Sequence, residues 1–289
     1  MSSEQHAPSA GEYITHHLQH LQKDFSFNSV KQTSIVDFSL FNLDSLVVGT
    51  FLGMLAVAFL WIGARKATSG VPGRWQAAVE MLVEMVDNQA KGVIHNEASR
   101  RFIAPMALMV FVWIFAMNFM DMLPVDALPQ LWHTVGPAMG FKDYLRVVPT
   151  ADLSTTLGMS SFVLILCIYY NLKIKGAGGW AHELIAAPFG DRWFLWPLNF
   201  LMQIIEFVAK TVSHGMRLFG NMYAGELVFM LIALMGGAWA LSALGVSMAV
   251  GHVIAGTIWT LFHILVIVLQ AFIFMMLTLI YLGQAHDAH

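Results

Sequence analysis

The sequence carries little charge. Its 289 residues include 15 lysines and arginines and 18 aspartates and glutamates, so that 11% are charged while 57% are hydrophobic. Soluble globular domains contain about 25% charged residues. This deficit excludes an intrinsically disordered chain, a nucleic-acid-binding protein and an ordinary cytosolic enzyme. The composition predicts a polytopic protein of the lipid bilayer with five or six membrane-spanning helices.

Other features are also scarce. The single cysteine, Cys167, lies in an apolar run, so no disulfide framework is expected. Residues 1–36 are polar and lack the apolar core of a cleavable secretion signal. No Walker loop or Rossmann glycine run is present, so no cofactor is expected. His16, His17 and His20 have no third type of ligand beside them, and a solvated segment is favoured over a metal site there.

Three apolar runs are each long enough to cross a bilayer as a helix of about 20 residues. They comprise residues 45–64, 102–120 and 153–172. Residues 176–197 mix Gly, Trp and Pro, which predicts a loop with an interfacial aromatic belt.

Residues 75–95 have a different pattern. Glu80, Glu84 and Asp87 recur at helical spacing, while valines and leucines fill another face. This pattern predicts an amphipathic helix that lies at the membrane interface instead of crossing it.

The last third of the chain is almost free of charge. After Glu226 no charged residue appears before Asp287. A single helix over 60 residues would be about 90 Å long, three times the hydrocarbon thickness. The chain must therefore fold back, which we place near residues 236–251, between long helices at 199–235 and 252–283.

The predicted fold is an all-α polytopic membrane protein. It has about five transmembrane helices and one interfacial amphipathic helix, and the last two helices are long, tilted and form a hairpin. Residues 1–40 are predicted to form an extramembrane segment on the periplasmic side, and residues 41–289 the membrane domain.

Basic residues predict the orientation, because cytoplasmic loops are enriched in Lys and Arg. The loop between the first two spans and the segment after the third hold nine basic residues: Arg65, Lys66, Arg74, Lys91, Arg100, Arg101, Lys173, Lys175 and Arg192. The opposite side holds four: Lys23, Lys31, Lys142 and Arg146. We therefore expect the N-terminus outside and the C-terminus in the cytoplasm.

Arg217 is the main candidate functional residue. A charge within a membrane helix is costly, and arginine cannot discard its proton. Helical spacing places Asn221 and Ser213 on its face, with Lys210, Glu206 and Gln203 following toward the start of the helix. Glu226 falls about 180° away from Arg217 on the helix. This layout predicts two polar routes that do not meet directly.

The predicted helix at 252–283 also carries a polar face, like the helix that contains Arg217. His252, His263 and Gln270 lie near one line along it. An unperturbed histidine titrates near neutral pH, which suits a proton relay. A lone histidine in an apolar helix is more often a packing residue, but the presence of Glu226 and Gln270 favours the relay.

Several motifs together resemble one family. They are residues 67–73 (ATSGVPG), 117–124 (MNFMDMLP), 148–152 (VPTAD), 210–226 (KTVSHGMRLFGNMYAGE) and 263–275 (HILVIVLQAFIFM). In this order they resemble the a subunit of the membrane (Fo) sector of bacterial F-type ATP synthases, of the proteobacterial type. The resemblance extends from about residue 40 to residue 283.

The resemblance implies a proton-conducting stator subunit in the bacterial inner membrane, which is no enzyme on its own. Two offset half-channels would carry protons to and from carboxyl groups of a rotating c-subunit ring, coupling proton flow to ATP synthesis. The implied partners are the c ring, the b subunits of the peripheral stalk and the rest of the synthase. Arg217 corresponds to the essential cation that faces the ring.

The resemblance also assigns residues to the half-channels. On the periplasmic side are Asn221, Glu226, His263 and Gln270, with Asp121, Asp126 and Asp152 near the mouth. Simple solvation in a loop is an equal alternative for Asp126 and Asp152. On the cytoplasmic side are Gln203, Glu206, Lys210, Ser213 and His214.

The cytoplasmic side departs from the family pattern. The best-known relatives carry Glu at the position of Gln203 and a small hydroxyl residue at that of Glu206, so Glu206 becomes the expected acid of this side. His214 replaces a small or apolar residue and is either an extra proton relay or a packed imidazole, with packing favoured. The connection at 236–251 is also expected to be longer than in close relatives.

Two other functions are compatible with a polytopic membrane protein that carries ionisable residues in its helices. A proton-coupled secondary transporter also places ionisable groups in mid-membrane, but such folds have internal repeats, and none is found. A membrane zinc protease would need a second histidine after His182-Glu183, where Ala186 stands.

Overall fold

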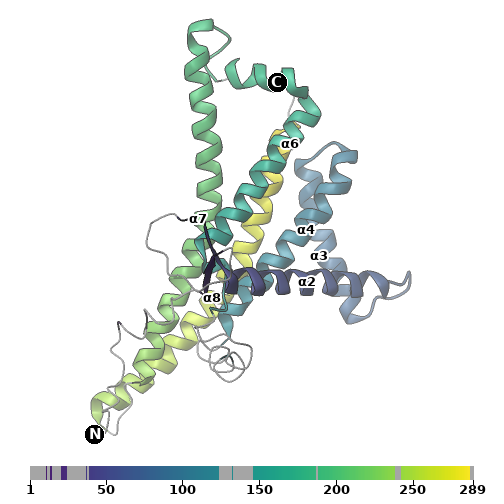
Figure 1. Ribbon diagram of the computed structural model, residues 1–289. Helices are drawn as coiled ribbons and strands as arrows, with labels where there is room; N and C mark the ends of the chain where they lie inside the picture. The colour runs from purple at the N-terminus through teal and green to yellow at the C-terminus, as the bar shows by residue number, and fades with distance from the viewer. Residues whose placement is uncertain are drawn as a thin grey trace. The chain divides into compact units, whose positions relative to one another are not determined.

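The fold is described from a computed structural model. It describes residues 21–24, 37, 39–123, 146–186, 188–237 and 242–286, and the single residues 11, 14 and 132. Within this part of the chain, five helices are long and apolar enough to cross a membrane (Figure 1): Leu43–Arg65, Glu97–Met122, Leu153–Ala186, Trp193–Gly237 and Ala243–Gln284. The predicted all-α polytopic class is confirmed.

The described elements follow the apolar runs of the sequence. The helices are α2 (Leu43–Arg65), α3 (Arg74–Val93), α4 (Glu97–Phe119), α6 (Leu153–Ala186), α7 (Trp196–Gly237) and α8 (Ala243–Gln284). Short 3₁₀ turns are η1 (Met120–Met122), η3 (Pro149–Ala151) and η4 (Trp193–Leu195). Strands β1 (Gln22–Asp24) and β2 (Leu40–Asn42) form an antiparallel pair. At 42 residues, α7 and α8 are each about 63 Å long, twice the hydrocarbon thickness.

Helix α3 is amphipathic, as the sequence predicts. Val79, Val86 and Ala90 are buried, whereas the carboxylates of Glu80 and Glu84 lie on exposed positions. Its place at a membrane interface stays a prediction.

The chain divides into two compact units. The first contains residues up to 52, 116–152 and 220–268, and the second contains residues 53–115, 153–219 and 269–289. Helices α2, α4, α7 and α8 each contribute residues to both units.

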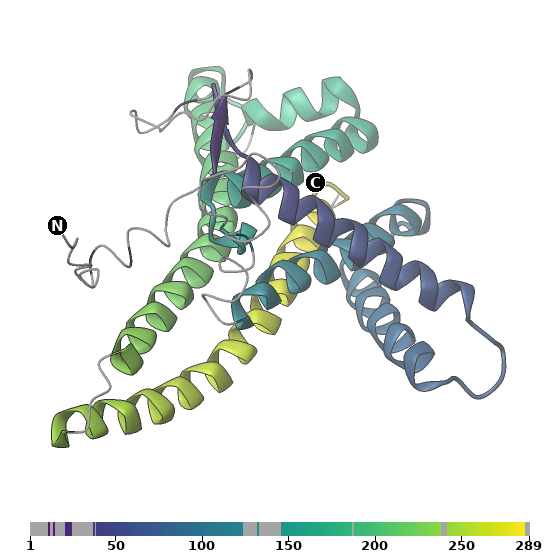
Figure 2. The same cartoon turned by 60° about the horizontal axis from the view of Figure 1, so that its bottom comes forward.

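In the first unit, the end of α7 and the start of α8 lie side by side and antiparallel (Figure 2). Nδ1 of His252 is 2.7 Å from the carbonyl oxygen of Ile232. Because a carbonyl can only accept, Nδ1 is the donor. In the same unit Asp44, at the start of α2, accepts a hydrogen bond from the backbone N–H of Leu21 at 3.1 Å.

The connection between α7 and α8 is shorter than predicted. Helix α7 continues to Gly237 and α8 begins at Ala243, so the predicted connection over 236–251 is wrong in extent. The glycines that indicated a turn are close-packing positions instead. A Cβ on Gly236 would lie 3.1 Å from the His252 ring, and one on Gly251 would lie 2.9 Å from Met235.

In the second unit, glycines allow helices to approach closely. A Cβ on Gly63 of α2 would lie 2.7 Å from Val79 of α3. A Cβ on Gly283 of α8 would lie 2.5 Å from Val93, at the end of α3. The end of α8 is therefore fixed against α3.

Helix α6 continues where a loop was predicted. Gly176 has φ 72° and ψ 162°, which kinks the helix, but helical turns resume and extend to Ala186. The ammonium of Lys175 lies 2.8 Å from both carboxylate oxygens of Glu183 and so ties the two sides of the kink together. The loop prediction was wrong for 177–186 because only one glycine of this segment leaves the helical conformation.

Candidate functional site

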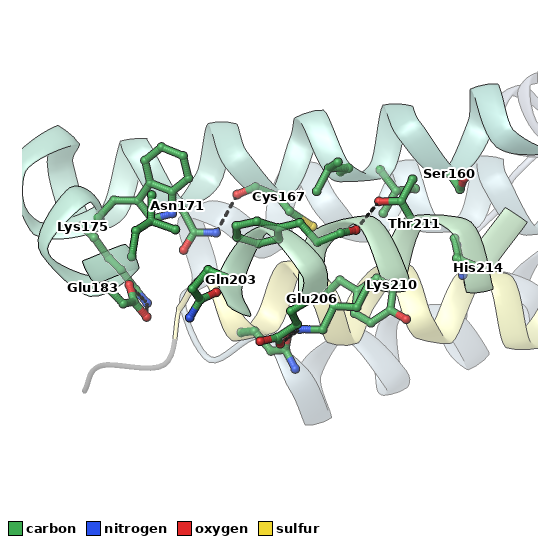
Figure 3. A pocket seen from close by; sticks show the side chains of 17 residues that line it. Ser160, Cys167, Asn171, Lys175, Glu183, Gln203, Glu206, Lys210, Thr211 and His214 are labelled. Carbon is green, nitrogen blue, oxygen red and sulfur yellow. Dashed lines mark hydrogen bonds and ion pairs between the residues drawn. The ribbon is translucent and has the colours of Figure 1, made fainter. Parts of the chain in front are cut away.

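A cavity in the second unit is lined by α6, α7 and α8. Its volume is about 370 Å³. Polar and ionisable side chains of these helices line it (Figure 3): Ser160, Cys167, Asn171, Lys175, Glu183, Gln203, Glu206, Lys210, Thr211, His214, Tyr281 and Gln284. Four of the five residues assigned to the cytoplasmic side are brought together here. The fifth, Ser213, lies on an exposed position of α7.

Two ion pairs border the cavity. Lys175 and Glu183 pair across the kink of α6. On α7 the ammonium of Lys210 lies 2.6 Å from Oε1 of Glu206, one turn away. Lys210 also donates a hydrogen bond of 2.9 Å to Gln284 near the end of α8. Lys210 therefore holds the carboxylate of Glu206 and the amide of Gln284 at the wall of the cavity.

Gly215 brings α7 against α6 at one end of this cavity. A Cβ there would lie 2.9 Å from Oγ of Ser160 and 3.1 Å from the carbonyl oxygen of Thr156. The preceding residue, His214, is buried and stacks on Phe274 of α8 with ring centroids 3.8 Å apart. Glycine at 215 is therefore what places His214 and Ser160 at the same end of the cavity.

Arg217 lies on an exposed position midway along α7. Ser213, Asn221 and Ala224, which share its helix face by spacing, are exposed as well. Exposed apolar side chains of the same helix include Val212 and Met216. The guanidinium therefore stands on an open, otherwise uncharged stretch of a membrane helix.

A buried polar contact in the first unit joins η1 and α8 and forms the centre of a buried polar cluster there. Oδ2 of Asp121 lies 2.7 Å from Nε2 of His263, and both side chains are buried. The two atoms are in ion-pair contact, although neither has a hydrogen bond of good geometry within the described residues. Phe229 and Trp259 flank the imidazole with ring centroids 5.2 and 6.1 Å away. The structure thus brings together two residues that the sequence assigned to the same side.

Gly225 accommodates this imidazole. A Cβ on Gly225 would lie 2.2 Å from Cε1 of His263. No side chain larger than hydrogen fits there without displacing the ring.

The next residue, Glu226, forms a buried ion pair with Arg146. The guanidinium also lies 5.8 Å from the ring centroid of Tyr223. From the sequence, Arg146 was expected only as a loop charge that contributes to orientation, and its contact with Glu226 was not predicted. Its place two residues before the 148–152 motif was the available signal.

The remaining assigned residues differ in their surroundings. Gln270 and Asp152 are buried, 6% and 4% exposed. Asp152 donates its backbone N–H to the carbonyl of Pro149 at 3.1 Å. Asn118 and Thr150 are buried in the same unit as Asp152, with side-chain polar atoms that lack hydrogen-bond partners among the described residues. Asp126 lies outside the described residues.

No metal centre is formed by the residues that the structure describes, since they contain no group of three or more His, Cys, Asp or Glu side chains able to hold an ion. The histidines at 16, 17 and 20 lie outside the described residues.

Comparison with known proteins gives consistent results. The family model described as "ATP synthase A chain" matches residues 46–283. The chain is 68% identical to ATP synthase subunit a of Paracidovorax citrulli (strain AAC00-1) over 298 residues, which cover all of both chains. It is 68% identical to that of Acidovorax sp. (strain JS42), again over the full lengths, and 47% identical to that of Shewanella piezotolerans (strain WP3 / JCM 13877) over 96% of each chain. The chain therefore belongs to the ATP synthase A chain family.

Proposed function

We propose that this multi-pass membrane protein is the proton-conducting stator subunit of a bacterial F-type ATP synthase, located in the inner membrane. It would carry protons to and from carboxyl groups of a c-subunit ring, and so couple proton flow to ring rotation and ATP synthesis by the rest of the complex. The observation that carries the proposal is the exposed Arg217 midway along a 42-residue membrane helix.

An exposed arginine midway along a membrane helix needs a polar or anionic partner. Its charge is costly in hydrocarbon by a contested amount, from about 2.5 to more than 10 kcal/mol. Because guanidinium cannot lose its proton, the cost is offset only by an anion from another subunit or by water. A carboxylate of a c ring would supply that anion, and Arg217 would favour its ionised form. A protonated ring carboxyl would thus release its proton before passing Arg217, which also blocks direct leakage between the half-channels.

The periplasmic half-channel would use the buried polar cluster of the first unit. Asp121 and His263 are in contact, and an imidazole can accept a proton at one ring nitrogen and donate one from the other, which suits proton transfer. Glu226 is held by Arg146. By the family resemblance, Asn221 and Gln270 would adjoin this pathway, and Asp126 and Asp152 would lie near its mouth.

The cytoplasmic half-channel would use the cavity of α6, α7 and α8. A polar cavity of about 370 Å³ has room for several water molecules. Glu206 would be its acid in place of Gln203, with Lys210 beside it and Ser213 on the exposed face of α7.

The remaining parts of the proposal concern the whole assembly. The membrane potential contributes about 2.3 kcal/mol per charge per 100 mV to proton flow. The c ring would lie against the hairpin of α7 and α8, and b subunits of the peripheral stalk would hold the protein in place. The N-terminal segment, residues 1–40, would be periplasmic, with the membrane domain at 41–289 and the C-terminus in the cytoplasm.

Replacing the arginine tests the central step. In Arg217→Ala we expect ATP synthesis and ATP-driven proton pumping to be abolished while the complex still assembles. Pumping is measured by quenching of a pH-sensitive dye in inverted vesicles, and assembly by co-purification of the c ring. Arg192→Ala, at an exposed position before η4, is the matched control and should pump normally. Wild-type pumping in Arg217→Ala would refute the proposal, and purification without a c ring would favour a transporter.

A further inference from the structure

His214 lies at one end of the cavity between α6, α7 and α8. Figure 3 shows it beside Ser160, at the opposite end of the lining from Lys175 and Glu183. The residue is 2% exposed, and its Nε2 has no hydrogen-bond partner among the described residues. A buried polar nitrogen without a partner is destabilising, and such groups in native proteins commonly bond an internal water. This nitrogen is therefore expected to bond water in the cavity.

Aromatic packing fixes the direction of the imidazole. Its face lies against Phe274 with centroids 3.8 Å apart, and Tyr281 approaches in a T-shaped arrangement at 5.7 Å. With its surroundings apolar on this side, the nitrogen-bearing edge is the part left for polar contacts. A phenylalanine would fill the same space without leaving a nitrogen unpaired, so packing alone does not explain a histidine here.

The walls of the cavity can continue a chain of hydrogen bonds from His214. The hydroxyl of Ser160 donates to the carbonyl of Leu157, and that of Thr211 donates to Phe207, at 3.0 and 2.8 Å. Each hydroxyl oxygen keeps lone pairs that accept from water. The other ionisable groups that line the cavity are Lys175, Cys167 and Glu183 on α6, Glu206 and Lys210 on α7, and Tyr281 on α8, and Arg217 follows His214 by one turn of α7.

We propose that His214 is a proton relay at the inner end of this cavity, one helical turn before Arg217. This inference rests on the proposed function. The imidazole takes a proton released by a ring carboxyl group, directly or through water, and the imidazolium returns a proton to water in the cavity. Only N–H and O–H bonds are made and broken, and the histidine ends in its starting state.

Two variants separate a relay from a packing residue. His214→Phe keeps the aromatic stack and removes the nitrogens, whereas Phe274→Leu disturbs the stack and keeps them. Passive proton flux is measured in inverted vesicles stripped of the catalytic sector, with c-ring co-purification as the assembly control. We expect flux to fall about tenfold in His214→Phe and to change less in Phe274→Leu. Wild-type flux in an assembled His214→Phe complex would overturn the relay.

Chemical rescue distinguishes the two roles further, because added imidazole would not restore proton flux if His214 only packed against its neighbours. In His214→Ala, added imidazole is expected to restore flux, since a small base can occupy the vacated space, whereas added benzyl alcohol is not. Rescue by both or by neither would count against the relay. If Arg217→Ala is inactive while His214→Phe conducts normally, only this inference fails; if Arg217→Ala pumps normally, the proposed function fails.

The single cysteine tests whether the cavity is reached by water. Cys167 lines the same cavity. In inverted vesicles, 2-aminoethyl methanethiosulfonate should lower wild-type flux and have no effect on Cys167→Ser. Unchanged wild-type flux after mass spectrometry shows that Cys167 has been modified would mean that protons do not pass through this cavity, and would overturn the relay.

Discussion

Gly225 is the residue that leaves room for the buried ring of His263. His263 is buried, and a Cβ placed 2.2 Å from its Cε1 would displace the ring or force α7 and α8 apart at this point. In Gly225→Ala we expect the displaced imidazole to lose its contact with Asp121 and passive proton flux to fall about tenfold or more. Flux into vesicles measures this, and Gly158→Ala, where a Cβ meets no atom within 4 Å, is the control. Unchanged flux in Gly225→Ala would mean that the Asp121–His263 contact is not needed.

A second prediction concerns Glu206, the acid expected on the cytoplasmic side in place of a glutamate at position 203. Glu206 and Gln203 line the same cavity, but only Glu206 has an ionisable side chain, since the amide of Gln203 neither gains nor loses a proton. We therefore expect Glu206→Gln to slow proton flux more than Gln203→Ala does, when both are compared at equal content of assembled complex. Equal, negligible effects would remove Glu206 from the pathway.

The residues of the candidate site differ in how far the sequence predicts them. Asp121 and His263 were assigned to one side of the membrane by resemblance, and the structure places them in contact. The partner of Glu226 was not predicted, because Arg146 is 80 residues away and only tertiary structure brings the two together. A charge in a loop and a charge buried in an ion pair look the same in a sequence.

At the scale of the helices, long apolar runs are predictable because the bilayer fixes their length. Glycines are less informative, since the same residue serves as a kink, a turn or a close contact between helices. Gly176 kinks α6 with a positive φ, whereas Gly236 and Gly251 are helical positions that face a neighbouring helix. This ambiguity explains the errors at 176–186 and at 236–251.

The kink of α6 leads to a third prediction. The conformation of Gly176 is one that other residues adopt at a cost of about 1–3 kcal/mol. Gly176→Ala should therefore lower the thermal stability of the detergent-solubilised complex. Gly179→Ala is the matched control, because Gly179 is helical and a Cβ there makes only an ordinary contact of 3.8 Å with Lys175. Equal thermal unfolding midpoints for the two variants would contradict this account of the kink.

At the scale of the whole molecule, the scarcity of charge indicates the class of protein and the distribution of Lys and Arg indicates its orientation. The predicted orientation is open to a direct test because the chain has one native cysteine. In a Cys167→Ser background, Ser39→Cys and Thr68→Cys each place one thiol at an exposed position. A membrane-impermeant maleimide should label Ser39→Cys from the periplasm and Thr68→Cys only from the cytoplasm. The reverse pattern would invert the orientation.

The close glycine contacts have a genetic consequence. Gly63, Gly215, Gly225 and Gly283 each lie where a Cβ would come within 3.0 Å of another residue. A change in the first or second base of a glycine codon gives a stop codon or a residue that has a Cβ. Nearly every missense mutation at these four codons therefore produces a steric conflict inside a helix contact. Random mutagenesis with selection for growth on a non-fermentable carbon source should return glycine at these four positions, with only silent third-base changes in their codons.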